Sequence, residues 1–345
     1  TVLFLNQSTP GGTLVFSPSA NVLLGNNFDA VASADFNGDG KPDLAIVDYN
    51  AQTVSVYTNV STLGNLSFTL QAAMTPSVHP TMLEAGDMNS DGLPDIILGY
   101  YDTQNFVTLF RNRSNFNFDN AVSFTVGGTS PEGTAIGDIN GDGMPDIVSS
   151  NLSNSTISIL VNAATVGGAL SFNSAVTYTL PNSSSAPHRV AIGDINGDGK
   201  LDVVTANYGS SDISIFRNDG AQGVGAAISL TALSLHPSVG TNPYAIAIGD
   251  VTGDGIPDLV VGNYSSNTIS VLKNTTASTS TITLASRIDY SSGASPFWIE
   301  LGDLNSDSKL DIAVGHEGNN VFTLLQNVMP ALAPVITSFA PASGS

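Results

Sequence analysis

A nine-residue motif that occurs six times constrains this chain more than any other feature. Its first copy reads Asp35-Phe-Asn-Gly-Asp-Gly-Lys-Pro-Asp43, and the leading Asp recurs at positions 87, 138, 194, 250 and 303. The copies therefore follow one another at intervals of 51 to 56 residues. A near-constant period of this length is typical of repeated structural units, each of which buries its apolar surface against its neighbours.

The residues between the motifs predict four short strands in each unit. A short apolar stretch precedes each motif, as in Thr134–Ile136, and a β-branched run follows it, as in Leu259–Val261. An alternating segment such as Thr53–Tyr57 comes next, and a fourth segment such as Leu66–Leu70 ends the unit. Alternation and β-branched residues indicate strands, and no segment shows a helical period over 11 residues or more. Four strands in about 50 residues predict one blade of a β-propeller.

With these motifs the chain resembles the FG-GAP/VCBS β-propellers found in integrin α-subunit heads and in many bacterial surface proteins. The resemblance covers residues 1–330 and implies an all-β propeller with four-stranded blades. Residues 1–23 match the third and fourth strands of a blade, so we expect seven blades rather than six. The last residues, 331–345, resemble the first strand of an IPT/TIG immunoglobulin-like domain, with a linker as the alternative. We therefore expect this sequence to be part of a larger multidomain chain.

The charge of the chain limits its partners. It has 29 acidic and 9 basic residues, which gives a net charge of −20. Nucleic-acid binding needs Lys and Arg to displace counterions from phosphate, so we expect no nucleic-acid partner. The same charge disfavours anionic membranes, and no apolar run approaches the ~20 residues of a membrane span. Cysteine is absent, which excludes disulfides, thiolate metal sites and thiol nucleophiles.

The motif has the ligand chemistry of a calcium loop. A hard divalent cation is held by six or seven oxygens at about 2.3–2.6 Å. Side-chain oxygens at motif positions 1, 3, 5 and 9 and the carbonyl at position 7 provide such a set, and glycine at position 6 permits the turn. By resemblance, the loop joins the first two strands of each blade. The expected calcium ligands are Asp35, Asn37, Asp39, Lys41, Asp43, Asp87, Asn89, Asp91, Leu93, Asp95, Asp138, Asn140, Asp142, Met144, Asp146, Asp194, Asn196, Asp198, Lys200, Asp202, Asp250, Thr252, Asp254, Ile256, Asp258, Asp303, Asn305, Asp307, Lys309 and Asp311.

Two loops depart from the motif. Thr252 replaces the asparagine at position 3 and offers only a hydroxyl oxygen, and Ser308 replaces the glycine at position 6. We expect the sixth loop to be the weakest site. Because calcium at such loops needs millimolar concentrations, the motif indicates an extracellular or cell-surface protein.

No catalytic motif is present, and we expect no enzymatic activity. The four histidines lack metal-ligand spacing, and there is neither a Gly-x-Ser-x-Gly motif nor a phosphate-binding glycine loop. Glu84 and Glu300 stand three residues before their motifs, where the other four copies have alanine. Because the first strand of a blade lines the channel, the two glutamates are either a carboxylate pair there or two hydrated polar residues.

Aromatic residues beside Asn, Asp and His gather in the loops expected on the face opposite the motifs. Rings that pack on apolar faces beside polar groups that fix orientation suit glycans or extracellular protein ligands. The expected ligand-binding residues are Tyr49, Tyr101, His188, Tyr208, Tyr244, Tyr264, Phe297 and Trp298. The sequence thus predicts a calcium-stabilised binding or adhesion module. Two alternatives remain open, namely an architectural unit of a surface protein or filament and an accessory domain of a larger secreted enzyme.

Overall fold

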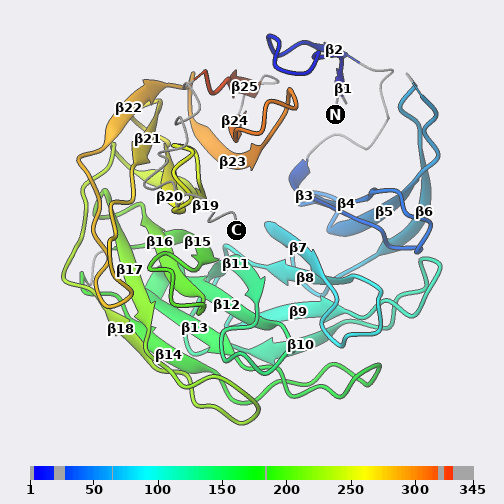
Figure 1. Cartoon of the computed structure of the whole chain (residues 1–345). Coiled ribbons are helices and arrows are strands. Elements are labelled where there is room, and N and C mark those ends of the chain that lie inside the picture. Colours follow the sequence, from blue (N-terminus) through cyan, green and yellow to red (C-terminus); the bar gives the residue numbers. More distant parts are fainter. Residues whose placement is uncertain (1–3, 19–27, 64, 183–184, 318–321, 329–345) are drawn as a thin grey trace, which may run out of the picture.

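The computed structural model describes residues 4–18, 28–63, 65–182, 185–317 and 322–328, and within them the chain folds almost entirely into strands. Six sheets stand around a central axis with their first strands innermost (Figure 1). In chain order these blades are β3 (Phe28–Ala34), β4 (Asp43–Asp48), β5 (Thr53–Asn59) and β6 (Phe68–Met74); β7 (Met82–Gly86), β8 (Asp95–Gly99), β9 (Phe106–Phe110) and β10 (Val122–Thr125); β11 (Pro131–Gly137), β12 (Asp146–Asn151), β13 (Thr156–Leu160) and β14 (Val176–Thr179); β15 (Pro187–Gly193), β16 (Asp202–Asn207), β17 (Asp212–Asn218) and β18 (Leu230–Ala232); β19 (Pro243–Gly249), β20 (Asp258–Asn263), β21 (Thr268–Leu272) and β22 (Ile288–Ser291); and β23 (Pro296–Gly302), β24 (Asp311–His316) and β25 (Phe322–Leu325). A short 3₁₀ helix, Leu152–Asn154, lies between β12 and β13.

The expectation of seven blades was wrong, because six sheets carry a first strand and form the blades. In the described part of the chain, five of these sheets have four strands and the sixth has three. Among the described residues, strands β1 (Phe4–Asn6) and β2 (Phe16–Pro18) pair only with each other, and this hairpin adds no inner strand. It lies against the sixth blade, where the Leu14 amide donates to Gln326 Oε1 at 3.2 Å. The segment 331–345 lies outside the described residues.

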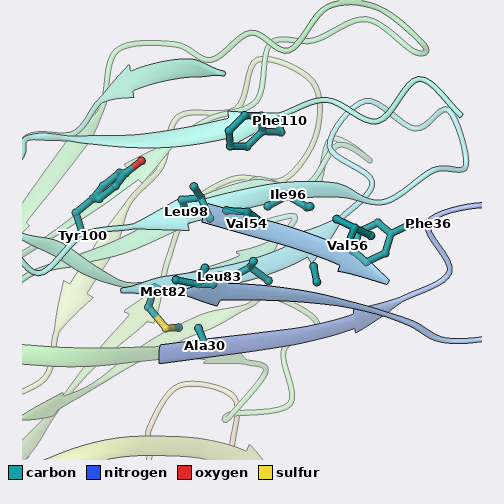
Figure 2. Close-up of a cluster of buried hydrophobic side chains, with 12 residues drawn as sticks. Ala30, Phe36, Val54, Val56, Met82, Leu83, Ile96, Leu98, Tyr100 and Phe110 are labelled. Carbon is teal, nitrogen blue, oxygen red and sulfur yellow. The ribbon is translucent and has the colours of Figure 1, made fainter. Parts of the chain in front are cut away.

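Second strands are buried on both faces because each blade is packed between two neighbours. All residues of β8, β12, β16 and β20 are buried, whereas the outermost strands β10, β14 and β22 are largely exposed. Figure 2 shows the cluster between the first two blades, in which Phe36, Leu98 and Tyr100 are fully buried. Burial of one such side chain contributes about 1.5–3 kcal/mol, so packing between blades is the main stabilising term.

In blades two to six, an asparagine at or just after the end of the third strand joins the blade to the one before it. Asn112 Nδ2 donates to the carbonyl of Phe36 in the preceding blade at 2.8 Å and to Pro94 in its own motif at 3.2 Å. The equivalent bonds to the preceding blade are those of Asn162 to Met88, Asn218 to Ile139, Asn274 to Ile195 and Asn327 to Val251. Asn6, which ends β1, makes the same bond to Leu304. The motif loops are therefore built into the contacts between blades.

No α-helix occurs in the described part of the chain, and none of its helical segments is long and apolar enough to cross a bilayer.

Candidate functional site

The six motif loops join the first and second strands of their blades, as the resemblance implied. The first motif fills the connection between β3, which ends at Ala34, and β4, which begins at Asp43. Since β3 and β4 are antiparallel, the β4–β5 turn lies at the opposite end of the blade. The structure thus has two loop faces, one carrying the motifs and one carrying the aromatic residues.

The first Asp of each motif organises its loop. Asp35 Oδ1 accepts the amides of Gly38 and Asp39 at 2.8 and 3.1 Å, and Oδ2 accepts the amide of Gly40 at 2.7 Å. The same carboxylate-to-amide pattern recurs in the other five loops. This carboxylate therefore fixes the turn in addition to any role as a ligand.

The ninth motif residue is a buried carboxylate that connects its loop to the third strand. Asp95 Oδ2 accepts the amide of Met88 at 3.0 Å, and Oδ1 accepts the amide of Asn112 at 2.8 Å. Burial first, and then the charges of the other motif carboxylates, raise the pKa to about 7 at Asp95 and to about 6 at Asp146 and Asp202. Clustered negative charge at low solvation is relieved by a bound cation.

The position-3 asparagine turns its Oδ1 into the loop, where that of Asn89 or Asn140 accepts the amide of position 5, and in two loops its amide nitrogen bonds to the next blade. Asn89 Nδ2 donates to the carbonyl of Gly168 in the third blade at 2.9 Å, and Asn196 Nδ2 donates to Thr279 in the fifth. In the sixth loop Asn305 Nδ2 donates to Gly12, while its buried Oδ1 has no hydrogen-bond partner among the described residues. A buried unpaired acceptor beside Asp303 and Asp307 fits a hard cation.

The described residues nevertheless contain no convergent group of three His, Cys, Asp or Glu side chains that could hold a metal ion. The motif side chains provide oxygen donors, the type of ligand that calcium takes, but their carboxylates do not converge on one point in the described residues. The chain's own amides engage the carboxylates at positions 1 and 9.

On the opposite face, a cavity of about 340 Å³ opens at the mouth of the central channel. It is lined by residues from all six blades, namely Asp29, Thr81, Tyr101, Glu132, His188, Tyr208, Tyr244, Tyr264, Phe297 and Glu317. We name this cavity the central pocket. A larger hollow of about 770 Å³ lies between the third and fourth blades, but Asp142 is its only titratable lining residue. The central pocket therefore has the richer set of groups for recognition.

The wall of the central pocket formed by the third to sixth blades is a rigid network around Glu132. One Glu132 oxygen lies 2.6 Å from His188 Nδ1, and the other accepts the hydroxyl of Tyr244. Burial alone would raise the pKa of Glu132, but bonding to His188 and the nearby charge of Arg189 hold it below its usual value. The Tyr244 ring stacks between His188 and Phe297, with centroids 4.2 Å apart on each side. Burial and the charge of Glu132 raise the pKa of Tyr244 well above 10, so its hydroxyl stays protonated.

The sixth and first blades contribute exposed acidic groups to the central pocket. Glu317 accepts the hydroxyl of Tyr264, which raises the pKa of that tyrosine. Asp29 accepts the Tyr49 amide at 3.2 Å. Its pKa is raised by partial burial and by the charges of Asp48 and Glu317. The two carboxylates therefore act on each other across the junction between these blades.

A buried cation lies next to the pocket wall. The Arg189 guanidinium lies 4.9 Å from the Trp298 ring, 5.3 Å from the Tyr244 ring and 5.5 Å from the Phe297 ring. None of its nitrogens has a hydrogen-bond partner among the described residues. Its charge partly offsets the rise in the pKa of Glu84, which burial and the charge of Glu300 bring to about 7. The two glutamates named from the sequence are therefore electrostatically coupled.

The structure gathers six of the eight predicted ligand-binding residues in the central pocket: Tyr101, His188, Tyr208, Tyr244, Tyr264 and Phe297. Tyr49 instead packs on His79, with ring centroids 4.9 Å apart. Trp298 is not part of the pocket lining, and its Nε1 donates to Glu300 at 2.8 Å.

Sequence reasoning did not select Asp29, Thr81, Glu132 and Glu317, which also line the pocket. Asp29, Thr81 and Glu132 occupy the position just before or within the first strand that His188, Tyr244 and Phe297 occupy in their own blades. Aligning the repeats at this position would have selected Asp29, Thr81 and Glu132.

Comparison with known proteins agrees with this fold. The FG-GAP-like repeat family matches residues 35–98, 87–149, 138–205, 194–261 and 250–314. The chain belongs to this family. The immunoglobulin-like segment expected after the propeller has no such match. No curated relative matches the sequence.

Several solved structures share the fold of this family member. A protein from Lactobacillus plantarum is 15% identical, with a TM-score of 0.60 over 91% of this chain and 84% of the other. A putative 6-phosphogluconolactonase from Bacteroides fragilis is 14% identical, with a TM-score of 0.64 over 94% and 90% of the two chains. A second protein of that description, from Bacteroides uniformis, is 13% identical, with a TM-score of 0.62 over 91% and 84%. At these identities the likeness concerns the fold alone.

Proposed function

We propose that this chain is an extracellular ligand-binding module that takes a glycan or an extracellular protein at the central pocket. The observation that carries the proposal is the lining of this pocket by side chains from every blade. A concave site with aromatic walls and a few polar groups is the usual form of a ligand site. Because Glu132 uses both oxygens to hold His188 and Tyr244, we assign this network to shaping the site and not to catalysis.

The proposal includes calcium in the motif loops. When bound, the ions would supply positive charge that offsets the clustered carboxylates. The chain itself orients the position-3 oxygens, as Asn305 and Asn89 show, and anchors each loop to the third strand of its blade. Occupied loops would therefore stiffen the contacts between blades. A need for millimolar calcium supports the extracellular location.

Screening of glycan arrays and extracellular proteins, followed by titration of the best ligand, tests the proposal. Tyr208 is half-buried in the pocket wall, 4.9 Å from His188 between ring centroids. Tyr208→Ala should weaken binding at least tenfold, because buried aromatic anchors contribute about 2 kcal/mol or more. Tyr290→Ala is the matched control, since Tyr290 is an exposed tyrosine on the outer strand β22. Equal affinity of both variants for every ligand would contradict a pocket-based function and favour an architectural unit.

A further inference from the structure

We propose that the central pocket selects ligands that carry a positively charged ammonium group, which would lie between Tyr264, Asp29 and Glu317. The inference rests on the proposed function and adds the chemistry of the ligand. It draws on three features of the pocket: its charge, its aromatic walls and its unpaired acceptors.

The charged lining of the pocket is acidic. Its three carboxylates are Asp29, Glu132 and Glu317, its one basic group is His188, and it contains neither lysine nor arginine. Glu132 already has the His188 imidazole at 2.6 Å and the positive charge of Arg189 nearby. Asp29 and Glu317 have no ion-pair partner among the described residues. Two mutually repelling carboxylates are stabilised by a cation placed between them.

The aromatic walls suit the same ligand. The ring centroids of Tyr208, Tyr244 and Tyr264 form a triangle with sides of 6.1 to 6.5 Å. A cation over this triangle lies within about 6 Å of the Tyr208 and Tyr264 centroids, the range in which ring faces attract cations. Tyr264 and Tyr244 donate their hydroxyls to carboxylates, which makes both rings more electron-rich. His188 and Phe297 cover the faces of Tyr244, so Tyr264 and Tyr208 present the free ring surface.

The pocket also has free acceptors for an ammonium group. Each carboxylate of the Asp29 and Glu317 pair bonds through one oxygen, which leaves the other oxygen available. Thr81 Oγ1 is buried in the lining and has no hydrogen-bond partner among the described residues. An ammonium group has three donors and no acceptor, so these groups match it, whereas a ligand carboxylate would meet repulsion.

Two pairs of probes test the proposal by isothermal titration calorimetry on the whole chain. Glucosamine and N-acetylglucosamine differ in the charge of one nitrogen, as do Nα-acetyl-lysine methylamide and its Nε-acetyl derivative. We expect at least one ammonium probe to bind tenfold more tightly than its acetylated form. Preference for glucosamine would identify an amino glycan as the source of the ammonium group, and preference for the lysine derivative would identify a protein.

Charge-removing variants locate the site. Glu317→Gln and Asp29→Asn should each weaken ammonium binding about fivefold. Asp119→Asn removes the same charge from an exposed residue paired with Arg113 and should leave affinity unchanged. Tyr264→Leu should weaken binding more than Tyr264→Phe, which keeps the ring.

The inference is overturned if charged and acetylated probes bind equally, or if neither ammonium probe binds at millimolar concentration. It is also overturned if Glu317→Gln, Asp29→Asn and Asp119→Asn have the same affinity for the ammonium probe. A ligand whose affinity does not depend on its charge, but whose binding is lost in Tyr208→Ala, would overturn only the ammonium preference. A ligand that is indifferent to Tyr208→Ala would overturn the pocket-based function itself.

Discussion

The backbone at motif position 6 is left-handed in every loop, and this single dihedral explains the glycine there. The φ angles lie between 82° and 91° at the five glycines, which are Gly40, Gly92, Gly143, Gly199 and Gly255. Ser308 adopts φ 65° in the sixth loop. A side chain in this conformation costs about 1–2 kcal/mol. The strain anticipated from the sequence at Ser308 therefore has a defined geometric origin.

Replacing Ser308 with glycine should stabilise the protein by about 1 kcal/mol, because it relieves this left-handed strain. The reverse change, Gly92→Ser, should destabilise the second loop by a similar amount. A Cβ at Gly92 would meet no atom within 4 Å, so the backbone conformation alone is tested. Denaturant unfolding in EDTA measures both changes without a contribution from metal. Equal stability of Ser308→Gly and the parent chain would show that the loop adapts to a side chain.

Among the structural elements, the motif analysis missed the asparagine at or just after the third strand of blades two to six, which bonds to the blade before it. Its signal was present in the sequence, since Asn162, Asn218 and Asn274 stand 17 residues after position 8 of their motifs and Asn112 stands 18 residues after it. The regular position of this asparagine is visible in the sequence, but its hydrogen-bond partner is not. An asparagine at a strand end can equally cap a turn or face solvent. Only the three-dimensional packing of blades shows this bond.

Asn218→Ala should destabilise the fold by about 2–3 kcal/mol. Asn218 is almost fully buried, and its loss removes the bonds to the carbonyls of Ile139 and Leu201, of which Ile139 keeps only the longer bond from Gln222 Nε2 at 3.3 Å. Asn59→Ala is the matched control, because Asn59 Nδ2 donates to Pro42 of its own blade. We expect a loss below about 1 kcal/mol for that variant. Equal losses measured by urea unfolding would contradict a role in joining blades.

The channel strand β7 makes stability depend on pH through Glu84. Its pKa of about 7 in the folded chain exceeds the unfolded value of about 4.3. Between these two values the folded state holds more protons, so the free energy of unfolding falls as pH rises from about 4.3 to 7. Glu84→Gln should abolish this decline and stabilise the chain by about 2 kcal/mol at pH 8. Asp119→Asn controls for total charge, and an unchanged pH profile in Glu84→Gln would contradict the burial of this carboxylate.

For the whole molecule, the repeat was sufficient to predict the propeller but not its number of blades. Strand patterning and the motif period identified the blade unit, because each unit folds in nearly the same environment. The blade number depends on how the β1–β2 hairpin pairs, and its sequence matches blade strands without stating their partners. The pocket was predicted in part, since aromatic residues were visible in the loops, whereas Glu132 and Arg189 gain their meaning only where different blades meet.

Removal of calcium should destabilise the entire ring of blades, because the motif loops are part of the contacts between blades. A cation that binds only the folded state at 100-fold saturation adds up to ~2.7 kcal/mol per site. Loss of two or more such sites should lower the melting temperature by about 10 °C or more. Calorimetry with EDTA, followed by restoration with calcium and separately with magnesium, measures the effect. Asp142→Ala should reduce the number of bound ions by one, since Asp142 is an expected side-chain ligand of the third loop, where its Oδ1 also accepts the Met144 amide. A melting temperature that is unchanged after metal removal has been verified would contradict structural calcium, and the hydrogen bonds of the loops would then account for their order without it.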